Sequence, residues 1–218
     1  MADKPVLTYF PIASRGETAR LICTVGELDF VNNMTPDGSM MEGEDKKDYF
    51  SPSGLPCLKH GDFKMAQSLP VEAYLSSIAP KYACLTPQQR GIDGVVCAIK
   101  EDVNAGTAGF LFKPEMEKDT ITKFLDKWYG IVEHKVPDSG FFNGLEFPTA
   151  ADFACVTMCE GYMPFVGSLK QAQLPLDYYK ACGKFPKLAA LVEKTMAYPA
   201  VAEYLNTSTS LKQAAFGK

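Results

Sequence analysis

The sequence lacks any apolar run long enough to span a bilayer. Its first residues, Met1-Ala-Asp-Lys-Pro, have neither the basic flank nor the apolar core of a secretion signal. Positive charge is not in excess either, since 22 Lys and Arg face 26 Asp and Glu and give a net charge of −4. We therefore expect a cytoplasmic protein without a membrane or nucleic-acid partner.

Histidine is scarce, and the chain has no C-x-x-C pair. His60 and His134 are far apart in the sequence, so we expect no metal site. An odd number of cysteines in a reducing compartment indicates free thiols rather than disulfides. The seven cysteines are Cys23, Cys57, Cys84, Cys97, Cys155, Cys159 and Cys182. Most of them fit as small buried hydrophobic residues, and for Cys57, which has no basic partner in view, a buried thiol is preferred to a nucleophile.

The first 79 residues have a mixed α/β pattern within a chain of 218 residues, which is long enough for one large or two small domains. β-branched and aromatic runs predict strands, and 3.6-residue periodicity predicts helices. In chain order the predicted segments are a strand at 5–10, a helix at 15–26 ended by Gly26, a strand at 28–33, one or two helical turns near 44–49, a hairpin of 55–59 and 63–66, and a helix at 68–78. The order β-α-β-α-β-β-α predicts a mixed sheet with helices on its faces.

Beyond a linker at residues 80–86, strand signals disappear and residues 87–218 carry helical patterns. The predicted helices are 87–111, 115–136, 149–165, 174–182 and 186–197. Thr149 and Asp152 have the spacing of a capping box at the start of the third of these. The polar tail at 207–218 is predicted to be loosely held.

The hairpin and the helix after it have the features of a peptide-binding edge. Pro56 cannot donate to a sheet ladder, so it indicates an edge, a bulge or a cis peptide and leaves the main chain of Leu55 available to a ligand. Gln67 and Ser68 stand where strand gives way to helix, and the free N–H groups of a helix start favour a carboxylate. An ordinary hairpin followed by an N-capping serine explains the same residues equally well.

Five motifs, in order and spacing, resemble those of glutathione transferases, and among the classes the likeness is greatest to the Sigma group. The motifs are Leu7-Thr-Tyr-Phe, Arg15-Gly-Glu-Thr-Ala-Arg20, Gly54-Leu-Pro-Cys-Leu, Ala66-Gln-Ser68 and Phe147-Pro-Thr-Ala-Ala-Asp152. The resemblance implies a thioredoxin-like domain with a mixed four-stranded sheet, followed by an all-helical domain that carries the electrophile pocket. It also implies a homodimer that uses glutathione as co-substrate, needs no cofactor and acts on a small hydrophobic electrophile.

For catalysis, the resemblance implies two residues. Tyr9 aligns with the tyrosine whose hydroxyl donates a hydrogen bond to the glutathione sulfur, and Arg15 with the arginine near it. Taken alone, Tyr9 could be a packing residue, and Arg15 could cap its helix or pair with Glu17 or Asp29.

For glutathione binding, the resemblance assigns Leu55, whose main chain pairs with the cysteinyl backbone, and Pro56, the family's cis-proline. Gln67 and Ser68 align with the pair that holds the γ-glutamyl end. Two weaker assignments are Lys47, which meets the glycyl carboxylate, and Asp102, which reaches the γ-glutamyl amine bound to the partner protomer. Both could equally be solvated surface charges. Glycines at 43 and 54 depart from the family pattern, which predicts weaker glutathione binding or a displaced Lys47.

The motifs predict an enzyme that conjugates glutathione to small electrophiles. Two alternatives stay open: a glutathione-dependent isomerase of the prostaglandin D synthase type, and a non-catalytic ligand carrier or crystallin-like relative. Family motifs do not identify the physiological electrophile or the residues that line its pocket.

Overall fold

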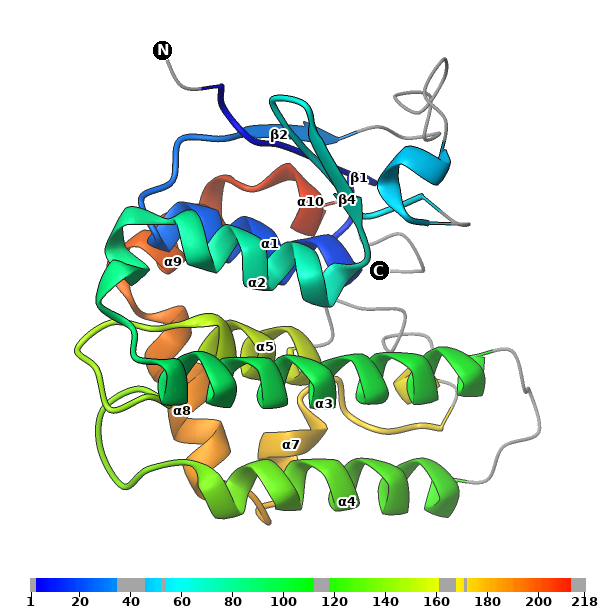
Figure 1. Cartoon of the computed structure of the whole chain (residues 1–218). Coiled ribbons are helices and arrows are strands. Elements are labelled where there is room, and N and C mark those ends of the chain that lie inside the picture. Colours follow the sequence, from blue (N-terminus) through cyan, green and yellow to red (C-terminus); the bar gives the residue numbers. More distant parts are fainter. Residues whose placement is uncertain are drawn as a thin grey trace.

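The computed structural model describes residues 3–34, 46–51, 54–111, 118–160, 168–170 and 172–212. A four-stranded sheet lies at one end of the molecule, and helices stack below it in layers (Figure 1). Gly43, the last residues of the predicted helix at 149–165 and the end of the chain from 213 lie outside the described residues.

The sheet is mixed, as the sequence predicts. Its strands are β1 (Val6–Tyr9), β2 (Val31–Met34), β3 (Cys57–His60) and β4 (Phe63–Ala66), in the order β2-β1-β3-β4. β1 is parallel to β2 and antiparallel to β3, and β3 is antiparallel to β4. β2 begins three residues later than predicted, after the residues that leave α1.

Two helices, α1 (Ser14–Val25) and α2 (Ser68–Ile78), pack against each other below the sheet (Figure 1). The predicted second helix is represented in the described part by one 3-10 helix, η2 (Lys46–Tyr49). Gly26 follows α1 as predicted, with φ at −70°. A Cβ on it would lie 2.5 Å from the Ile22 carbonyl oxygen and 2.7 Å from the Ala79 Cβ, so glycine is required by close packing rather than by a left-handed turn.

The predicted linker is ordered as η3 (Pro80–Cys84), and Tyr82 on it is fully buried. Helices follow as α3 (Pro87–Leu111), α4 (Lys118–Lys135), α5 (Ala150–Cys159), α7 (Tyr178–Ala181), α8 (Pro186–Met196), α9 (Pro199–Thr207) and α10 (Thr209–Lys212). Every residue of α5 is buried, and it packs against α1, α3 and α8. α5 is therefore the centre of the helical layers and joins them to the sheet half. In the described ranges no helix is both long and apolar enough to cross a membrane.

The capping box at the start of α5 is present as predicted. The Thr149 backbone N–H donates to Asp152 Oδ2 over 2.8 Å, and the Phe142 N–H donates to Asp152 Oδ1 over 2.8 Å. Burial raises the pKa of the Asp152 carboxyl to about 7 despite these hydrogen bonds. The box therefore orders the loop before α5 as well as the helix.

The C-terminal segment differs from the sequence prediction. α9 and α10 were not predicted, and Ser210, in the tail expected to be loose, is only 1% exposed. Helices of nine and four residues contain too few turns to show a clear apolar repeat. All seven cysteines are free thiols, as expected, and Cys57 is buried.

Candidate functional site

Several of the predicted residues meet at one end of three neighbouring strands. At this end, Thr8 of β1 is the last residue paired with β3, opposite Cys57, and Cys57 is in turn paired with Ala66 of β4. One residue further along each strand stand Tyr9, Pro56 and Gln67. Because paired strands keep their register, the catalytic candidate and both ligand-binding segments share this edge.

The Tyr9 ring is closely confined. It is 5% exposed, and a Cβ on Gly16 would come within 2.5 Å of its Cδ1 atom. The Arg20 guanidinium carbon lies 5.7 Å from the ring centroid on another side. No residue of the described ranges makes a hydrogen bond with the Tyr9 hydroxyl. Packing therefore fixes the ring, while the hydroxyl makes no hydrogen bond with the described residues.

Arg15 is paired with Glu101 of α3. Its Nε donates to Glu101 Oε2 over 2.9 Å. The partners considered from the sequence are engaged elsewhere: Glu17 pairs with Arg20, and Asp29 with Lys4.

Glu101 is surrounded by charged and polar groups of neighbouring helices. Burial opposes ionisation of its carboxyl, but the charges of Lys100 and Arg15 and a hydrogen bond from Ser68 outweigh burial and lower its pKa. Lys100 in turn pairs with Glu72 of α2, and both side chains are almost fully buried. An ionised Glu101 thus stands where α1, α2 and α3 meet.

The Leu55–Pro56 peptide is cis, and Pro56 is buried. No hydrogen bond to the Leu55 main chain is made by the described residues. Gln67 is exposed and has φ 77°, which is a strained backbone for a residue other than glycine, and its side chain makes no cap hydrogen bond with α2. Ser68 opens α2 and is 7% exposed. The capping interpretation therefore does not account for Gln67.

Lys47 is exposed on η2. Two residues later, Tyr49 is buried in a small apolar cluster with Cys57 and Ala66. η2 is thus anchored to the same end of β3 and β4 that holds Pro56 and Gln67, and it carries Lys47 near them.

Asp102 is exposed on α3, one residue beyond Glu101. The sequence prediction named Asp102, whose contact with the partner protomer's ligand stays a prediction, and it did not name Glu101. The helical period was a usable signal, because Val96, Lys100, Val103 and Thr107 form the buried face of α3 and Asp102 points away from it.

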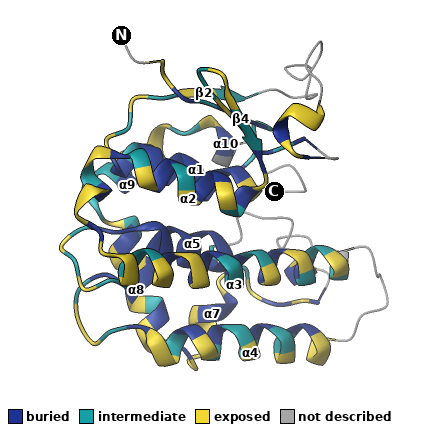
Figure 2. Cartoon of the chain, in the orientation of Figure 1, coloured by how far each residue is buried: buried dark blue, intermediate teal, exposed yellow. Residues whose placement is uncertain are grey.

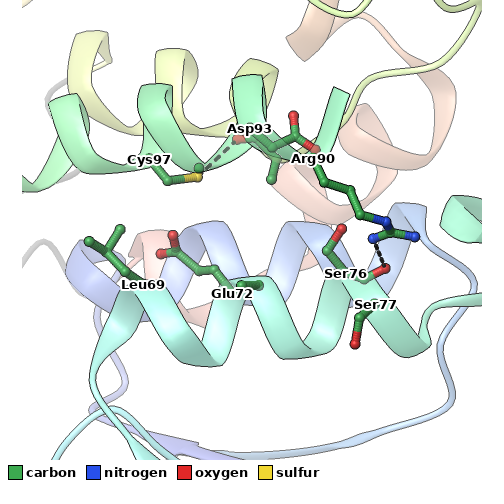
Figure 3. Close-up of a pocket in the computed structure, with 10 residues that line it drawn as sticks. Leu69, Glu72, Ser76, Ser77, Arg90, Asp93 and Cys97 are labelled. Carbon is green, nitrogen blue, oxygen red and sulfur yellow. Dashed lines mark hydrogen bonds between the residues drawn. The ribbon is translucent and has the colours of Figure 1, made fainter. Parts of the chain in front are cut away.

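A separate cavity of about 150 Å³ lies between α2 and α3 and contains none of the predicted site residues (Figure 3). Leu69, Glu72, Ser76, Arg90, Asp93 and Cys97 are among its lining residues. One carboxylate oxygen each of Glu72 and Asp93 is buried and has no hydrogen-bond partner among the described residues. Arg90 Nη1 donates to the Ser76 carbonyl over 3.3 Å, and the guanidinium charge partly compensates the Asp93 carboxylate.

Known proteins resemble the chain in sequence over its helical half and beyond. Residues 101–208 match the family model described as "Glutathione S-transferase, C-terminal domain". A Dictyostelium discoideum protein named as an alpha-3 glutathione S-transferase is 27% identical over 211 residues, which cover 93% of this chain and 94% of that protein.

Solved structures share the fold over nearly the whole chain. A Pi-class glutathione S-transferase of Onchocerca volvulus aligns with a TM-score of 0.69 and 22% identity, covering 97% of this chain and 94% of its own. Rat hPGDS, solved with a quinoline, aligns with a TM-score of 0.64 and 20% identity, covering 94% of this chain and 97% of its own. At such identities the structural matches show the thioredoxin-like and all-helical architecture, and the relatives' names span several classes.

Proposed function

We propose that the chain is a member of the glutathione transferase family and that it conjugates the glutathione thiolate to small apolar electrophiles, as the match of residues 101–208 to the family's C-terminal domain supports. The observation that carries this proposal is the meeting of Tyr9, the cis Leu55–Pro56 peptide and Gln67-Ser68 at one end of the sheet. We place the glutathione-binding domain at residues 1–79, the linker at 80–86 and the helical domain with the electrophile pocket at 87–218. The position of η3, Pro80–Cys84, supports this division.

The chemistry requires stabilisation of a negative charge on sulfur. A free thiol has a pKa near 8.5, and lowering it by about two units needs roughly 2.7 kcal/mol of preference for the thiolate. A hydrogen bond from a tyrosine hydroxyl to a charged acceptor contributes about 1.5–3 kcal/mol. Tyr9 acts as this donor and not as a base, and its hydroxyl has no competing partner among the described residues.

Glutathione lies along the edge in an extended conformation in this proposal. The Leu55 main chain pairs with the cysteinyl backbone beside Pro56, and Gln67 and Ser68 hold the γ-glutamyl end. Lys47 approaches the glycyl carboxylate from η2. Asp102 reaches the neighbouring protomer's ligand, whereas the contacts of Glu101 with Ser68 and Arg15 favour it as the acid of the chain's own site.

Two other functions use the same binding site. An isomerase of the prostaglandin D synthase type would share every assignment above, and a carrier or crystallin-like protein would keep the fold without turnover. The confined Tyr9 ring with a free hydroxyl supports catalysis over a purely structural role. Within the family the Tyr9-Phe10 and Ala66-Gln-Ser68 motifs favour a Sigma-like class, and a cytoplasmic enzyme accords with the sequence.

The test is retention on glutathione-agarose followed by a 1-chloro-2,4-dinitrobenzene assay. Binding with turnover supports conjugation. Binding without turnover favours the isomerase or the carrier. A prostaglandin H2 isomerisation assay distinguishes these two, because only the isomerase converts this substrate. Failure to bind contradicts all the glutathione assignments.

We also propose a homodimer formed through the outer faces of α2 and α3 (Figure 2). On α3, Val95 is 61% and Ile92 is 40% exposed, and nothing lies within 4 Å of where a Cβ would stand on Gly91 or Gly94. A small, apolar, open helix face allows a second helix to approach closely, and a stable dimer needs about 800 Å² from each partner.

Light scattering on a sizing column tests the dimer. Val95→Lys should produce a monomer of half the mass. Ile131→Lys, which changes a residue 44% exposed on α4, should leave the dimer intact. A wild-type monomer would contradict the proposal.

A further inference from the structure

The Glu17 carboxylate on α1 is fully buried and accepts three hydrogen bonds. Two of the donors come from the C-terminal helices. The Tyr204 hydroxyl of α9 donates to Oε1 over 2.8 Å, and the Ser210 hydroxyl of α10 donates to Oε2 over 3.0 Å. Arg20 Nη1 completes the set over 2.9 Å. A buried charge is tolerated only when it is paired and hydrogen bonded, so these contacts hold α9 and α10 against α1 (Figure 1).

Arg20 also contacts the loop that joins Tyr9 on β1 to Arg15 on α1. Its Nη2 donates to the Phe10 carbonyl and its Nη1 to the Ile12 carbonyl, each over 2.8 Å. Its guanidinium carbon also lies 5.7 Å from the Tyr9 ring centroid. The side chain is fully buried, so Arg20 cannot move without breaking its hydrogen bonds with Glu17 and with the carbonyls of Phe10 and Ile12.

The loop between β1 and α1 has few other supports. No backbone hydrogen bond outside the regular elements involves residues 10–13 in the described part of the chain. Ser14, where α1 begins, has φ 35°, a strained conformation that needs support from its surroundings. Arg20 is therefore the main polar support of the segment between Tyr9 and Arg15.

We propose that Tyr204 and Ser210 are positioning residues for Tyr9, acting through Glu17 and Arg20 on the loop at residues 10–13. In this proposal the C-terminal helices act on the glutathione site through α1 and the loop at residues 10–13. This inference rests on the proposed function for its catalytic consequence, but its structural step holds in the ligand-free protein.

The first experiment is NMR of the ligand-free chain with tyrosine labelled with carbon-13 at Cζ. The chain has ten tyrosines, and Tyr9→Phe assigns the Tyr9 signal. Tyr204→Phe and Ser210→Ala should each shift or split that signal. Tyr178→Phe is the matched control, because it removes a hydroxyl bond of 2.8 Å to Asp126 in the helical half and should leave the Tyr9 signal in place.

The second experiment is kinetic. Tyr204→Phe and Ser210→Ala should lower kcat by about three- to tenfold, with KM for glutathione changed less than about twofold. They should also raise the pKa of the bound thiol by about half a unit or more, read from thiolate absorbance. Tyr178→Phe should change neither quantity.

The NMR experiment tests the positioning role, and the kinetic experiment also depends on the proposed function, so the two hypotheses can fail independently. If the wild-type chain neither binds nor turns over glutathione, the proposed function falls, and the NMR comparison still decides the positioning. If the Tyr9 signal is unmoved in both Tyr204→Phe and Ser210→Ala, or moves equally in Tyr178→Phe, the positioning role is wrong. Should Tyr204→Phe fail to fold, Ser210→Ala, which keeps all ten tyrosines, decides the question.

Discussion

Arg15 Nε lies 2.9 Å from Glu101 Oε2, and this pair links the start of α1 to the middle of α3. In the ligand-free chain the charge of Arg15 is therefore partly compensated. Its attraction for a thiolate is weaker than the sequence alone suggests, because opposite charges nearby reduce the field that each produces. In the proposed mechanism, the Tyr9 hydroxyl then provides the greater share of the stabilisation of the sulfur.

Glu101→Gln should raise KM for glutathione by about tenfold, since the neutral amide loses the charge-assisted hydrogen bond from Arg15 Nε. Initial rates at varied glutathione measure this. Asp119→Asn, which makes the same kind of change at an exposed acid of α4, is the matched control and should leave KM unchanged. If Glu101→Gln leaves KM unchanged, or if Asp119→Asn raises it as much, Glu101 is not part of the glutathione site.

Gly16→Ala should lower kcat by about fivefold or more. A methyl group at residue 16 would lie 2.5 Å from Tyr9 Cδ1, so the ring must shift, and small misplacements of a catalytic group are costly. Gly130→Ala on α4 is the control, because its new methyl group finds its nearest atom at 4.0 Å. Equal rates for the two variants would show that the close contact does not position Tyr9.

Gln67→Gly should have opposite effects on stability and binding. Glycine relieves the backbone strain at φ 77° and should increase the free energy of unfolding by up to about 1 kcal/mol. Loss of the amide should weaken glutathione binding several-fold. Urea denaturation and calorimetric titration measure the two quantities, and a variant that binds as tightly as the wild type would exclude a ligand role for the side chain.

Asp152 should make the fold less stable as pH rises from about 4 to 7. Its pKa is about 7 in the folded chain against 3.8 as the ordinary value, so in this range the folded state binds more protons than the unfolded state. The contribution is absent below pH 3.8 and reaches its full unfavourable size above 7. Asp152→Asn has no carboxyl to titrate at this position, so its free energy of unfolding should not fall in this way. The free energy of unfolding of the wild type should therefore fall relative to that of the variant by up to about 4 kcal/mol between pH 4 and 7. A difference that is constant with pH would contradict the buried, raised-pKa carboxyl.

The order of strands and long helices was predictable because each has a strong local signal. β1 and β3 consist of apolar residues, alternating with polar ones or in a continuous run, between turn residues. Gly61, with φ +60°, marks the hairpin between β3 and β4. The Thr149 and Asp152 capping box was equally readable, since its two partners are three residues apart. Local chemistry therefore predicted most of the architecture.

The missed features depend on contacts between distant residues. Glu101 meets Arg15 across 86 residues, and Ser210 meets Glu17 across 193. No pattern near Ser210 indicates that it will be buried, because its partner lies on the first helix. Glu101 was not assigned from the sequence, because its partner Arg15 lies on another helix and no local pattern indicates that the two meet.

The most direct test of the central claim is the pKa of the glutathione thiol bound to wild-type protein and to Tyr9→Phe. Thiolate absorbance is followed from pH 5 to 10 at saturating glutathione. We expect a bound thiol pKa of about 6.5 in the wild type and a value near the free thiol's 8.5 in Tyr9→Phe, with similar affinity and at least about tenfold lower turnover. An equally low thiol pKa in both proteins, or the absence of any bound glutathione, would contradict it.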